Sequence, residues 1–437
     1  MGRAPRRGVR WLAAFGAASF ALALAPGALS PTPAAAGDWD GITMWETATV
    51  DRIVDGDTMM VIDDATGEKR RIRFIGINAP EKEVADRIVG AGHAGQCGWK
   101  QAYDELSALA PVGSKVRLAS SNQSSKGLKS RPQRVVFALN PLTNEYDIDL
   151  SWAMAERGWG IWFTVAHEAA MSAKYRAVVD RARERGVGIW DPTLCGEREQ
   201  PDAMIDMRIG LASVSGTVDD EWVSLRNTGT TTVDLSGWWL RNSDNTGWFT
   251  LPGGTVLTPG DYRVVHSGKG TSGKPDGHDV YAGARRKIYQ DPVKGGGQLL
   301  VGDGAYLLDK AGAYRFWREY PCAGDCAQDP LPDIAIDRVF LGRNRGKARA
   351  ATQTVTIANW GPVTTCMDGA RIESGSSVYR FKPGVCIAPG GTWTLVGGTG
   401  TDTPTTGHWN KTVPALWLTG SAILRNDLGT IASTKSW

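Results

Sequence analysis

The segment from Val54 to Thr58 places two carboxylates, Asp55 and Asp57, on either side of Gly56, directly after an apolar strand-like run. Glycine permits a sharp turn, which can direct Asp57 inward. Aspartate followed by glycine is also a common signal for a solvated hairpin turn. Taken alone, the segment is more typical of a turn than of a site, and the residues that follow it change this interpretation.

A second segment, residues 69–81, carries basic residues along a strand and ends in an oxygen-rich turn. It contains Arg73, Asn78 and Glu81. Calcium accepts carboxylate, amide and backbone carbonyl oxygens together, and a guanidinium matches phosphate oxygens in two-point geometry. An arginine, an amide and a carboxylate that meet at one strand end therefore suit a cation that bridges protein and phosphate. The alternative for the arginines of this region is surface ion pairing with nearby acids.

The charge distribution supports a local rather than a global attraction to polyanions. The formal net charge is +3, and removal of the first 36 residues, which hold four arginines and no acid, takes it to −1. No acidic residue occurs between Glu105 and Glu145, while six basic residues do. These are Lys115, Arg117, Lys126, Lys129, Arg131 and Arg134. Such a tract can steer a polyanion, and a solvated polar loop is the alternative.

The elements that position these residues are short strands and two or three helices between residues 45 and 195. Alternating apolar residues predict half-buried strands. They are expected at Ala48–Ile53, Thr58–Ile62, Arg71–Ile77, Lys115–Leu118 and Arg134–Leu139. Helices are expected over about 94–110, 148–157 and 166–185. Five strands and helices in this order suit a small closed barrel with helices packed on it.

The combined pattern resembles the staphylococcal-type nuclease (thermonuclease) family. The resemblance rests on Asp55-Gly56-Asp57-Thr58, Arg73, Asn78-Ala79-Pro80-Glu81 and a later arginine before a strand, and it covers residues 45–195. It implies an OB-fold barrel with three helices and a calcium-dependent phosphodiesterase, or endonuclease, that hydrolyses DNA or RNA.

The resemblance also implies roles for individual residues. Asp57, Asn78 and the carbonyl of Ala79 are expected to bind Ca²⁺, and Glu81 to position or deprotonate the attacking water. Arg73 and Arg134 are the expected phosphate arginines, with Arg131 as the rival of Arg134. Asn78 stands where the family has a second carboxylate, so calcium affinity is expected to be lower. We expect residues 37–200 to fold and cut alone, because the whole set lies there.

The second half of the chain, from about residue 203, is an internal repeat rich in tryptophan, glycine and threonine. The segment 222–229 parallels 355–361, and 252–260 parallels 382–390. Two immunoglobulin-like β-sandwich modules are expected, over 203–320 and 333–437. The first resembles the lamin-tail domain through Glu221–Asn227, Leu235-Ser236-Gly237-Trp238 and Leu257–Gly260. The second is a degenerate copy, and tryptophans such as Trp239 and Trp248 are interpreted as ordinary sandwich packing.

The first 36 residues predict a cleaved export signal. Four arginines precede an apolar run from Trp11 to about Leu24, and Ala34-Ala35-Ala36 fits a cleavage site. The run is shorter than the roughly 20 residues that span a membrane, which disfavours an anchor. We therefore expect a secreted protein, at the cell surface or free, whose mature chain does not contact a membrane.

Six cysteines in an exported chain favour disulfides over a zinc site. We predict the pairs Cys97–Cys195, Cys322–Cys326 and Cys366–Cys386. Two functions remain open beside the nuclease: a nuclease-shaped module that binds nucleic acid with little catalysis, and a surface or adhesion protein that binds a polymer through its β-sandwiches. The sequence does not decide the oligomeric state.

Overall fold

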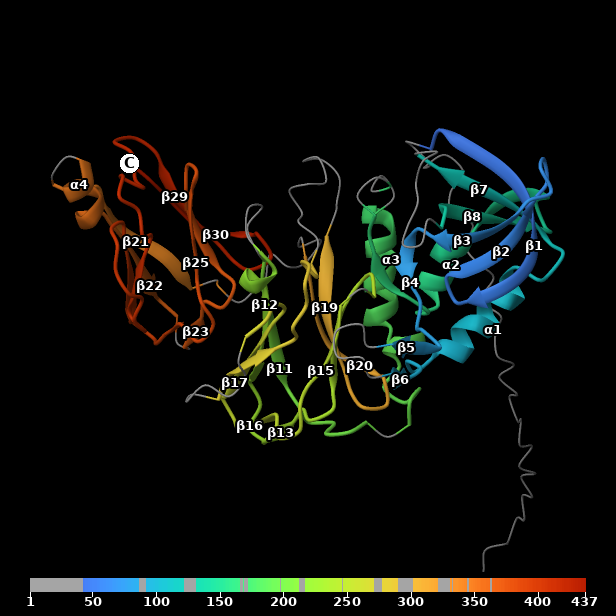
Figure 1. Ribbon diagram of the computed structural model, residues 1–437, viewed down its shortest axis with the longest axis horizontal. Helices are drawn as coiled ribbons and strands as arrows, with labels where there is room; N and C mark the ends of the chain where they lie inside the picture. Colours follow the sequence, from blue (N-terminus) through green and yellow to red (C-terminus); the bar gives the residue numbers. More distant parts are fainter. Residues whose placement is uncertain are drawn as a thin grey trace, which may run out of the picture. The chain divides into compact units, whose positions relative to one another are not determined.

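The computed structural model describes the chain from residue 42 to residue 437 with several internal gaps (Figure 1). The gaps are residues 86–91, 122–130, 166–167, 169–171, 197, 212–216, 246, 271–276, 290–301, 321–330, 332, 344–345 and 362–363. The expected export signal and the expected Cys322–Cys326 pair lie outside the described residues. The described part of the chain is mainly β-structure.

Strand β1 (Met44–Asp55) connects the two sides of the first sheet, because it pairs with both β2 and β7. The strand order is β3-β2-β1-β7-β8-β9, and β3 also pairs with β8 in parallel. This second pairing closes β1, β2, β3, β7 and β8 into a barrel. Register shifts along β1 follow Val50 and Ile53, and such bulges bend a strand sharply. The remaining strands are β2 (Thr58–Asp63), β3 (Lys69–Phe74), β7 (Lys115–Ser120), β8 (Gln133–Asn140) and β9 (Glu145–Asp149).

The basic segment expected as one strand over 71–77 breaks at Gly76. Strand β3 ends at Phe74, and β4 (Gly76–Asn78) pairs instead with β10 (Ile161–Phe163). Gly76 has a φ of 93°, and a Cβ there would lie 2.2 Å from the ring of Tyr175. Only glycine combines this backbone with so close an approach. A further hairpin, β5 (Glu83–Ala85) with β6 (Gly92–Ala94), follows.

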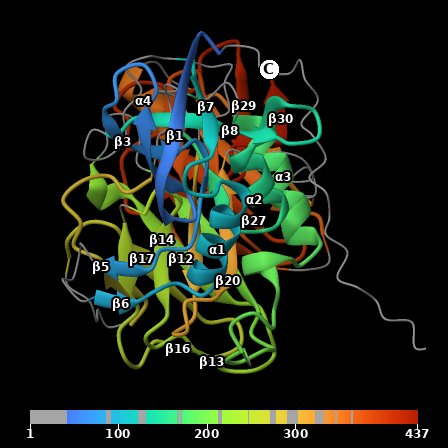
Figure 2. The ribbon, with the colours of Figure 1, turned by 90° about the vertical axis from the view of Figure 1, so that its right-hand side faces the viewer.

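Three helices lie next to one another against the barrel (Figure 2). They are α1 (Trp99–Leu109), α2 (Leu150–Glu156) and α3 (Ser172–Glu184), and the short helix η3 (Gly188–Trp190) follows. Asp149 caps α2 by accepting a hydrogen bond from the backbone N–H of Trp152, and the hydroxyl of Tyr175 donates to it at 2.7 Å. Burial raises the pKa of Asp149 to about 6, although these hydrogen bonds by themselves would lower it.

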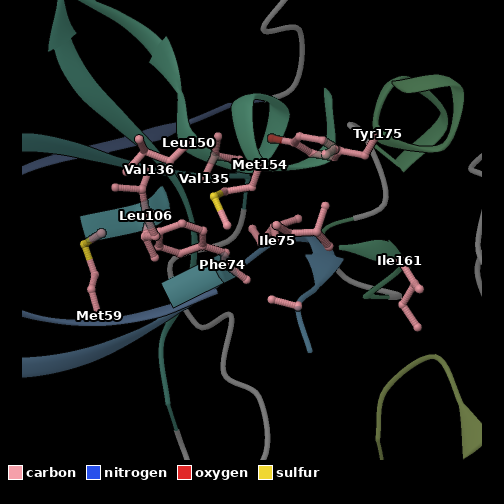
Figure 3. Packing of buried hydrophobic residues seen from close by; sticks show 14 of the residues in the cluster. Met59, Phe74, Ile75, Leu106, Val135, Val136, Leu150, Met154, Ile161 and Tyr175 are labelled. Atoms are coloured by element: carbon pink, nitrogen blue, oxygen red, sulfur yellow. The ribbon is translucent and has the colours of Figure 1, made fainter. Parts of the chain in front are cut away.

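The barrel core consists of side chains from the strands and from the inner faces of the helices (Figure 3). Phe74 and Leu106 are fully buried within it, and Tyr175 joins it from α3. The same cluster continues into the second half of the chain. It includes Trp239, Trp248, Tyr306, Leu308 and Tyr314. The interpretation of Trp239 and Trp248 as internal sandwich packing is therefore incomplete, because both join the barrel core.

Residues 205–320 form two four-stranded sheets and one short pair. The orders are β11-β12-β17-β18, β15-β14-β19-β20 and β13-β16. Within the first sheet, β18 runs parallel to β17. The bounds are β11 (Ile205–Gly210), β12 (Trp222–Asn227), β13 (Val233–Asp234), β14 (Trp239–Asn242), β15 (Trp248–Thr250), β16 (Val256–Leu257), β17 (Tyr262–His266), β18 (Asp279–Tyr281), β19 (Asp303–Leu308) and β20 (Tyr314–Tyr320), with η4 (Val218–Asp220) before β12.

Residues 334–436 repeat this strand pairing element by element. The orders are β21-β22-β27-β28, β25-β24-β29-β30 and β23-β26, and β28 runs parallel to β27. The bounds are β21 (Ile334–Phe340), β22 (Thr354–Asn359), β23 (Thr365–Cys366), β24 (Arg371–Ser374), β25 (Ser377–Arg380), β26 (Cys386–Ile387), β27 (Thr392–Val396), β28 (Thr406–His408), β29 (Ser421–Arg425) and β30 (Ile431–Ser436), with α4 (Gly346–Thr352) before β22. The repeat detected in the sequence is thus also a repeat of topology.

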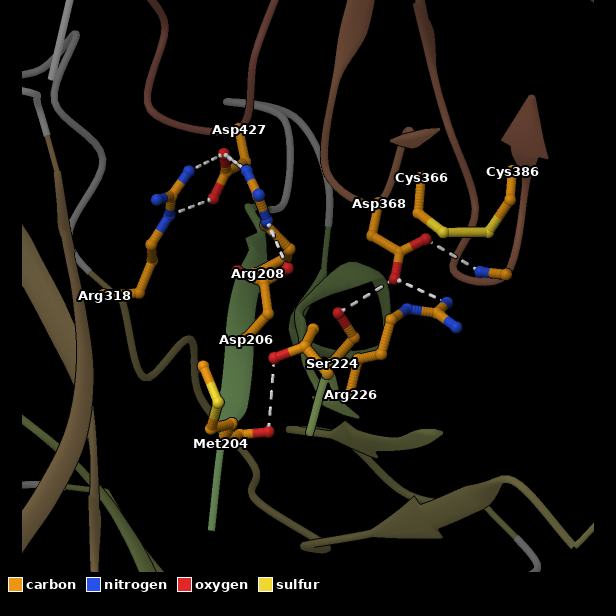
Figure 4. Close-up of polar contacts among 12 residues, drawn as sticks. Met204, Asp206, Arg208, Ser224, Arg226, Arg318, Cys366, Asp368, Cys386 and Asp427 are labelled. Atoms are coloured by element: carbon orange, nitrogen blue, oxygen red, sulfur yellow. Dashed lines mark hydrogen bonds and ion pairs between the residues drawn. A yellow bond between two sulfur atoms is a disulfide. The ribbon is translucent and has the colours of Figure 1, made fainter. Parts of the chain in front are cut away.

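Two buried carboxylates of the second sandwich bind arginines of the first (Figure 4). Asp427 accepts from Arg208 at 3.2 Å and from Nε of Arg318 at 2.7 Å. Asp368 accepts from the hydroxyl of Ser224 at 3.2 Å and from Arg226 at 3.4 Å. Breaking a buried charge pair of this kind is costly, because the remaining charge stays desolvated.

Two of the three predicted disulfides are confirmed. Cys97 and Cys195 are bonded with Cα atoms 5.8 Å apart, which ties the start of α1 to the chain that leaves the barrel. Cys366 and Cys386 are bonded between β23 and β26.

Within the described ranges, no helix is long and apolar enough to cross a membrane.

Candidate active site

Asp57 lies at the turn between β1 and β2, and the residue is 3 % exposed. One carboxylate oxygen, Oδ2, accepts the backbone N–H of Ala79 at 2.7 Å, and the other accepts the hydroxyl of Thr58 at 2.9 Å. The turn reaches Ala79 because residue 56 is glycine: a Cβ there would lie 2.7 Å from the Cβ of Ala79. The carboxylate therefore points inward, as the sequence predicted for a site and not for a solvated turn.

Arg73 is the penultimate residue of β3, and its guanidinium is held on Asp57. Nη1 lies 2.6 Å from Oδ1 of Asp57 and donates to the carbonyl of Ile77 at 3.2 Å. The guanidinium also lies over the ring of Phe163, 5.1 Å from its centroid. This arginine is 6 % exposed, so the interpretation as a surface ion pair does not apply to it.

Asn78 ends β4 and is 1 % exposed. Its Nδ2 donates to the backbone carbonyl of Ser243 at 2.8 Å, in the turn between β14 and β15. Its Oδ1 is buried and accepts no hydrogen bond from any described residue. A buried amide oxygen without a donor is unusual in proteins and calls for a ligand or a water.

Glu81 follows two residues after Ala79, and Gln96 holds its backbone from both sides. The backbone N–H of Glu81 donates to Oε1 of Gln96 at 2.9 Å, and the N–H of Gln96 donates to the carbonyl of Glu81 at the same distance. The Glu81 carboxylate accepts Nδ2 of Asn245 at 2.7 Å. Gln96 in turn contacts Arg241 at 3.1 Å and Tyr314 at 3.1 Å.

The carboxylates of this region shift one another's protonation. Burial, together with the nearby Asp57 and Glu81, raises the pKa of Asp55 to about 8. Burial and Asp57 also raise the pKa of Glu81, while Arg73, Arg241 and the Asn245 hydrogen bond oppose this. Carboxylates that perturb one another in a half-buried site are typical of functional sites, although structural networks also show them.

Arg134 lies apart from these residues. In the parallel pair of β3 and β8, Arg73 lies opposite Gln133, and Phe74 lies opposite Arg134. Because successive side chains point to opposite faces of a strand, Arg134 projects away from the face of Arg73. Its Nε lies 3.2 Å from Oε2 of Glu46 instead.

Arg131, the rival of Arg134, is close enough to the site to respond to its charges. Burial, Arg73 and Arg71 lower the pKa of Arg131, and Asp57 and Asp55 oppose them. Arg131 and Arg134 therefore both stay candidates for the second phosphate arginine. Of the basic tract, Lys115 pairs with Asp64 at 2.9 Å, Arg117 lies over the ring of Trp45, and Lys126 and Lys129 fall outside the described residues.

The donor set suits a hard cation, which the resemblance implies. Asp57 supplies a carboxylate, and Asn78 supplies the amide oxygen that has no donor. In the described parts of the chain no three aspartate, glutamate, histidine or cysteine side chains group as metal ligands. An ion at this place therefore needs amide, carbonyl and phosphate oxygens besides one carboxylate, which calcium accepts. Asp57 would share its charge between the ion and Arg73.

Sequence reasoning missed Gln96, Arg241 and Asn245. Arg241 and Asn245 lie in the second half of the chain, more than 140 residues after Gln96 in the sequence. No spacing pattern links residues so far apart. Asn245 has a left-handed backbone with a φ of 66°, as expected in a tight hairpin turn. An asparagine of this kind in the sequence predicts a turn and does not predict a functional site.

The comparisons with known proteins identify one region of the chain. The family model of the lamin tail domain matches residues 208–321. The chain therefore contains a lamin tail domain, an immunoglobulin-like fold, as predicted for this region. The comparison with curated proteins finds no match to the chain.

Proposed function

We propose that this chain is a secreted, calcium-dependent nuclease that hydrolyses phosphodiester bonds of DNA or RNA. In this proposal residues 45–195 are an OB-fold nuclease domain with three helices, and residues 333–437 are a degenerate second lamin-tail-like module. One observation carries the proposal: Asp57 binds both Arg73 and the backbone of Ala79, and the neighbouring Asn78 and Glu81 are both bound by the turn at residues 243–245. Two disulfides are compatible with an extracellular protein.

The chain's own residues would divide the work as follows. Arg73, together with Arg134 or its rival Arg131, would hold the phosphate and the charge that builds on its oxygens, where preorganised donors act most strongly. Glu81 would accept a proton from water for in-line attack. Calcium bound by Asp57, Asn78 and the carbonyl of Ala79 would supply a Lewis acid for a non-bridging phosphate oxygen.

The experiment is a cleavage assay of the mature protein on single- and double-stranded DNA and RNA, with calcium and with chelator. The proposal expects cleavage that calcium supports and chelation abolishes, and that Asp57→Ala removes. Protein that is folded yet inert on every nucleic acid would contradict it. Binding without cleavage would instead identify a nucleic-acid-binding module on the same barrel.

A second function, capture of a polymer ligand, is favoured by a cavity of about 800 Å³ lined by both sandwiches. Tyr262 stacks on His278 in its wall, with centroids 4.1 Å apart, and Arg380 and Lys382 line it from the other sandwich. Such cavities, with aromatic faces and a few polar groups, are typical binding sites. If this cavity captures polymer, Tyr262→Ala should weaken retention on DNA or cell-wall polysaccharide without changing turnover of a short oligonucleotide.

A further inference from the structure

The turn between β14 and β15 of the lamin tail domain reaches the candidate active site at two points. Nδ2 of Asn245 donates to the Glu81 carboxylate at 2.7 Å, and the carbonyl of Ser243 accepts Nδ2 of Asn78 at 2.8 Å. Glu81 and Asn78 are the expected water-activating and calcium-binding residues. The lamin tail domain thus contacts Glu81 through a side chain and Asn78 through its backbone.

We propose that Asn245 is a positioning residue for Glu81, so that the lamin tail domain completes the active site. This inference rests on the proposed nuclease function. A carboxylate that accepts a proton from water must present one oxygen to that water, and a donor on the other oxygen fixes which one. Asn245 donates to Oε1, so in the proposed mechanism Oε2 would be the oxygen that accepts the proton. Charged hydrogen bonds of this length are among the stronger ones in proteins.

The turn that carries Asn245 is hydrogen-bonded at both of its ends within the lamin tail domain. Asp303 is fully buried, and it accepts the backbone N–H and the hydroxyl of Ser243. Asn242 closes the turn by accepting the N–H of Gly247 at 3.0 Å and by donating to the carbonyl of Ile288 at 2.9 Å. A side chain on such a turn is placed accurately, as a positioning role requires.

A second set of contacts fixes the backbone of Glu81 to the same domain. Arg241 is 1 % exposed, and its Nη1 donates to Oε1 of Gln96 at 3.1 Å and to the hydroxyl of Tyr314 at 2.8 Å. Oε1 of Gln96 also accepts the N–H of Glu81. The lamin tail domain thus holds Glu81 by its side chain through Asn245 and by its backbone through Gln96.

The same arrangement gives a reason for the amide at position 78. An aspartate there would set a carboxylate against the carbonyl oxygen of Ser243, two acceptors with no proton between them. The asparagine donates to that carbonyl and keeps an oxygen, Oδ1, for another ligand. An amide at position 78, and not a carboxylate, is therefore compatible with the contact that Ser243 of the lamin tail domain makes here.

The test compares full-length variants in calcium-supported cleavage of a short oligonucleotide. Asn245→Gly removes the donor and suits the left-handed backbone at this position. Asn245→Asp keeps the shape but sets a second carboxylate against Glu81. Asn144→Gly is the control, because Asn144 has the same backbone conformation, with a φ of 59°, in the β8–β9 turn.

We expect kcat to fall about 10- to 100-fold in Asn245→Gly, the range for losing a hydrogen bond to a charged group. The loss should be greater in Asn245→Asp, with KM changed less than about twofold in both. The control should keep wild-type kcat and KM. An unchanged kcat in Asn245→Gly, or a loss confined to KM, overturns the inference while leaving the nuclease intact.

Failure of the nuclease proposal can be distinguished from this result. Wild-type protein would then show no calcium-supported cleavage, which would contradict the inference as well. The contact itself has a spectroscopic readout. In ¹⁵N-asparagine-labelled protein, the side-chain amide signal that disappears in Asn245→Gly should shift in Glu81→Gln. An unshifted signal would show that Asn245 does not bind Glu81.

Discussion

Nη1 of Arg73 lies 2.6 Å from Oδ1 of Asp57, and both side chains are almost fully buried. The two expected roles, phosphate binding for the arginine and calcium binding for the aspartate, thus meet in one ion pair. A cation at Asp57 must compete with, or share with, the positive charge of Arg73. In the proposed site, the pair would therefore couple calcium affinity at Asp57 to the phosphate-binding role of Arg73.

We expect Arg73→Gln to bind calcium more tightly than the wild type and to cleave about 10²- to 10³-fold more slowly. Removal of the guanidinium lowers the positive charge at the ion and removes a donor to the phosphate. Isothermal titration with calcium and cleavage kinetics measure the two effects. The exposed Arg52→Gln is the matched control and should change neither. Weaker calcium binding in Arg73→Gln would contradict the prediction that Asp57 binds the ion.

Glu81→Gln tests the water-activating role. Glutamine keeps the size of the side chain and an oxygen for Asn245, but it accepts no proton at neutral pH. Turnover should fall about 10²- to 10⁴-fold, the usual contribution of general-base catalysis, with substrate binding little changed. The exposed Glu68→Gln serves as the control. Full activity in Glu81→Gln would leave the nuclease proposal intact but would show that Glu81 does not activate the water.

The two candidate phosphate arginines should separate in a comparison of activity with stability. Arg131→Gln should reduce cleavage with little loss of stability. Arg134 is 4 % exposed and binds Glu46, so Arg134→Gln should cost about 1–3 kcal/mol in the free energy of unfolding. Urea denaturation and cleavage kinetics measure both variants. Reduced cleavage with little loss of stability in Arg134→Gln would instead identify Arg134 as the second phosphate arginine.

Sequence reasoning worked where a pattern is local. Period-two alternation located the strands that became β1, β2, β7 and β8, and the turn at Gly56 was expected to direct Asp57 inward, where it binds Arg73 and Ala79. The break at Gly76 was not predictable, because it depends on the ring of Tyr175 about 100 residues later. Nor was the face of Arg134, which depends on the register of β3 with β8.

Stability at low pH should depend on Glu319, which joins the lamin tail domain to α3. Burial alone would raise the pKa of Glu319, but Arg176, Arg183 and the hydroxyl of Tyr306 lower it to about 2. A lowered pKa stabilises the fold above the unfolded-state value of about 4.5, and this contribution is lost as the pH falls from about 4.5 to about 2. It amounts to about 3 kcal/mol.

The measurement is the free energy of unfolding from pH 2 to pH 6 for the wild type and Glu319→Gln. The variant should be less stable at pH 6 and should lose less stability on acidification, because it has no carboxylate to protonate. Glu199→Gln, at an exposed position near Lys310, is the control. Parallel curves for wild type and Glu319→Gln would show that Glu319 is not held ionised by the arginines.

The isolated barrel, residues 37–200, gives the sharpest test of how far the site extends. The sequence predicted that this fragment folds and cuts alone, because every carboxylate and arginine of the expected set lies in it. The structure gives two reasons to expect less. Aromatic residues of the lamin tail domain, among them Trp239, Trp248 and Tyr314, belong to the barrel core cluster, and Asn245 and Arg241 hold Glu81 in place.

We therefore expect the fragment to be less stable than the same region in the full chain and to expose apolar surface that binds a hydrophobic dye. Its kcat should be at least as low as that of full-length Asn245→Gly, because it lacks the same donor and the Arg241 contact as well. Adding residues 203–320 as a separate chain should restore part of the activity, since the interface can reform between two chains. A fragment that is folded by circular dichroism and has the kcat of the full chain would show that the barrel positions Glu81 without help.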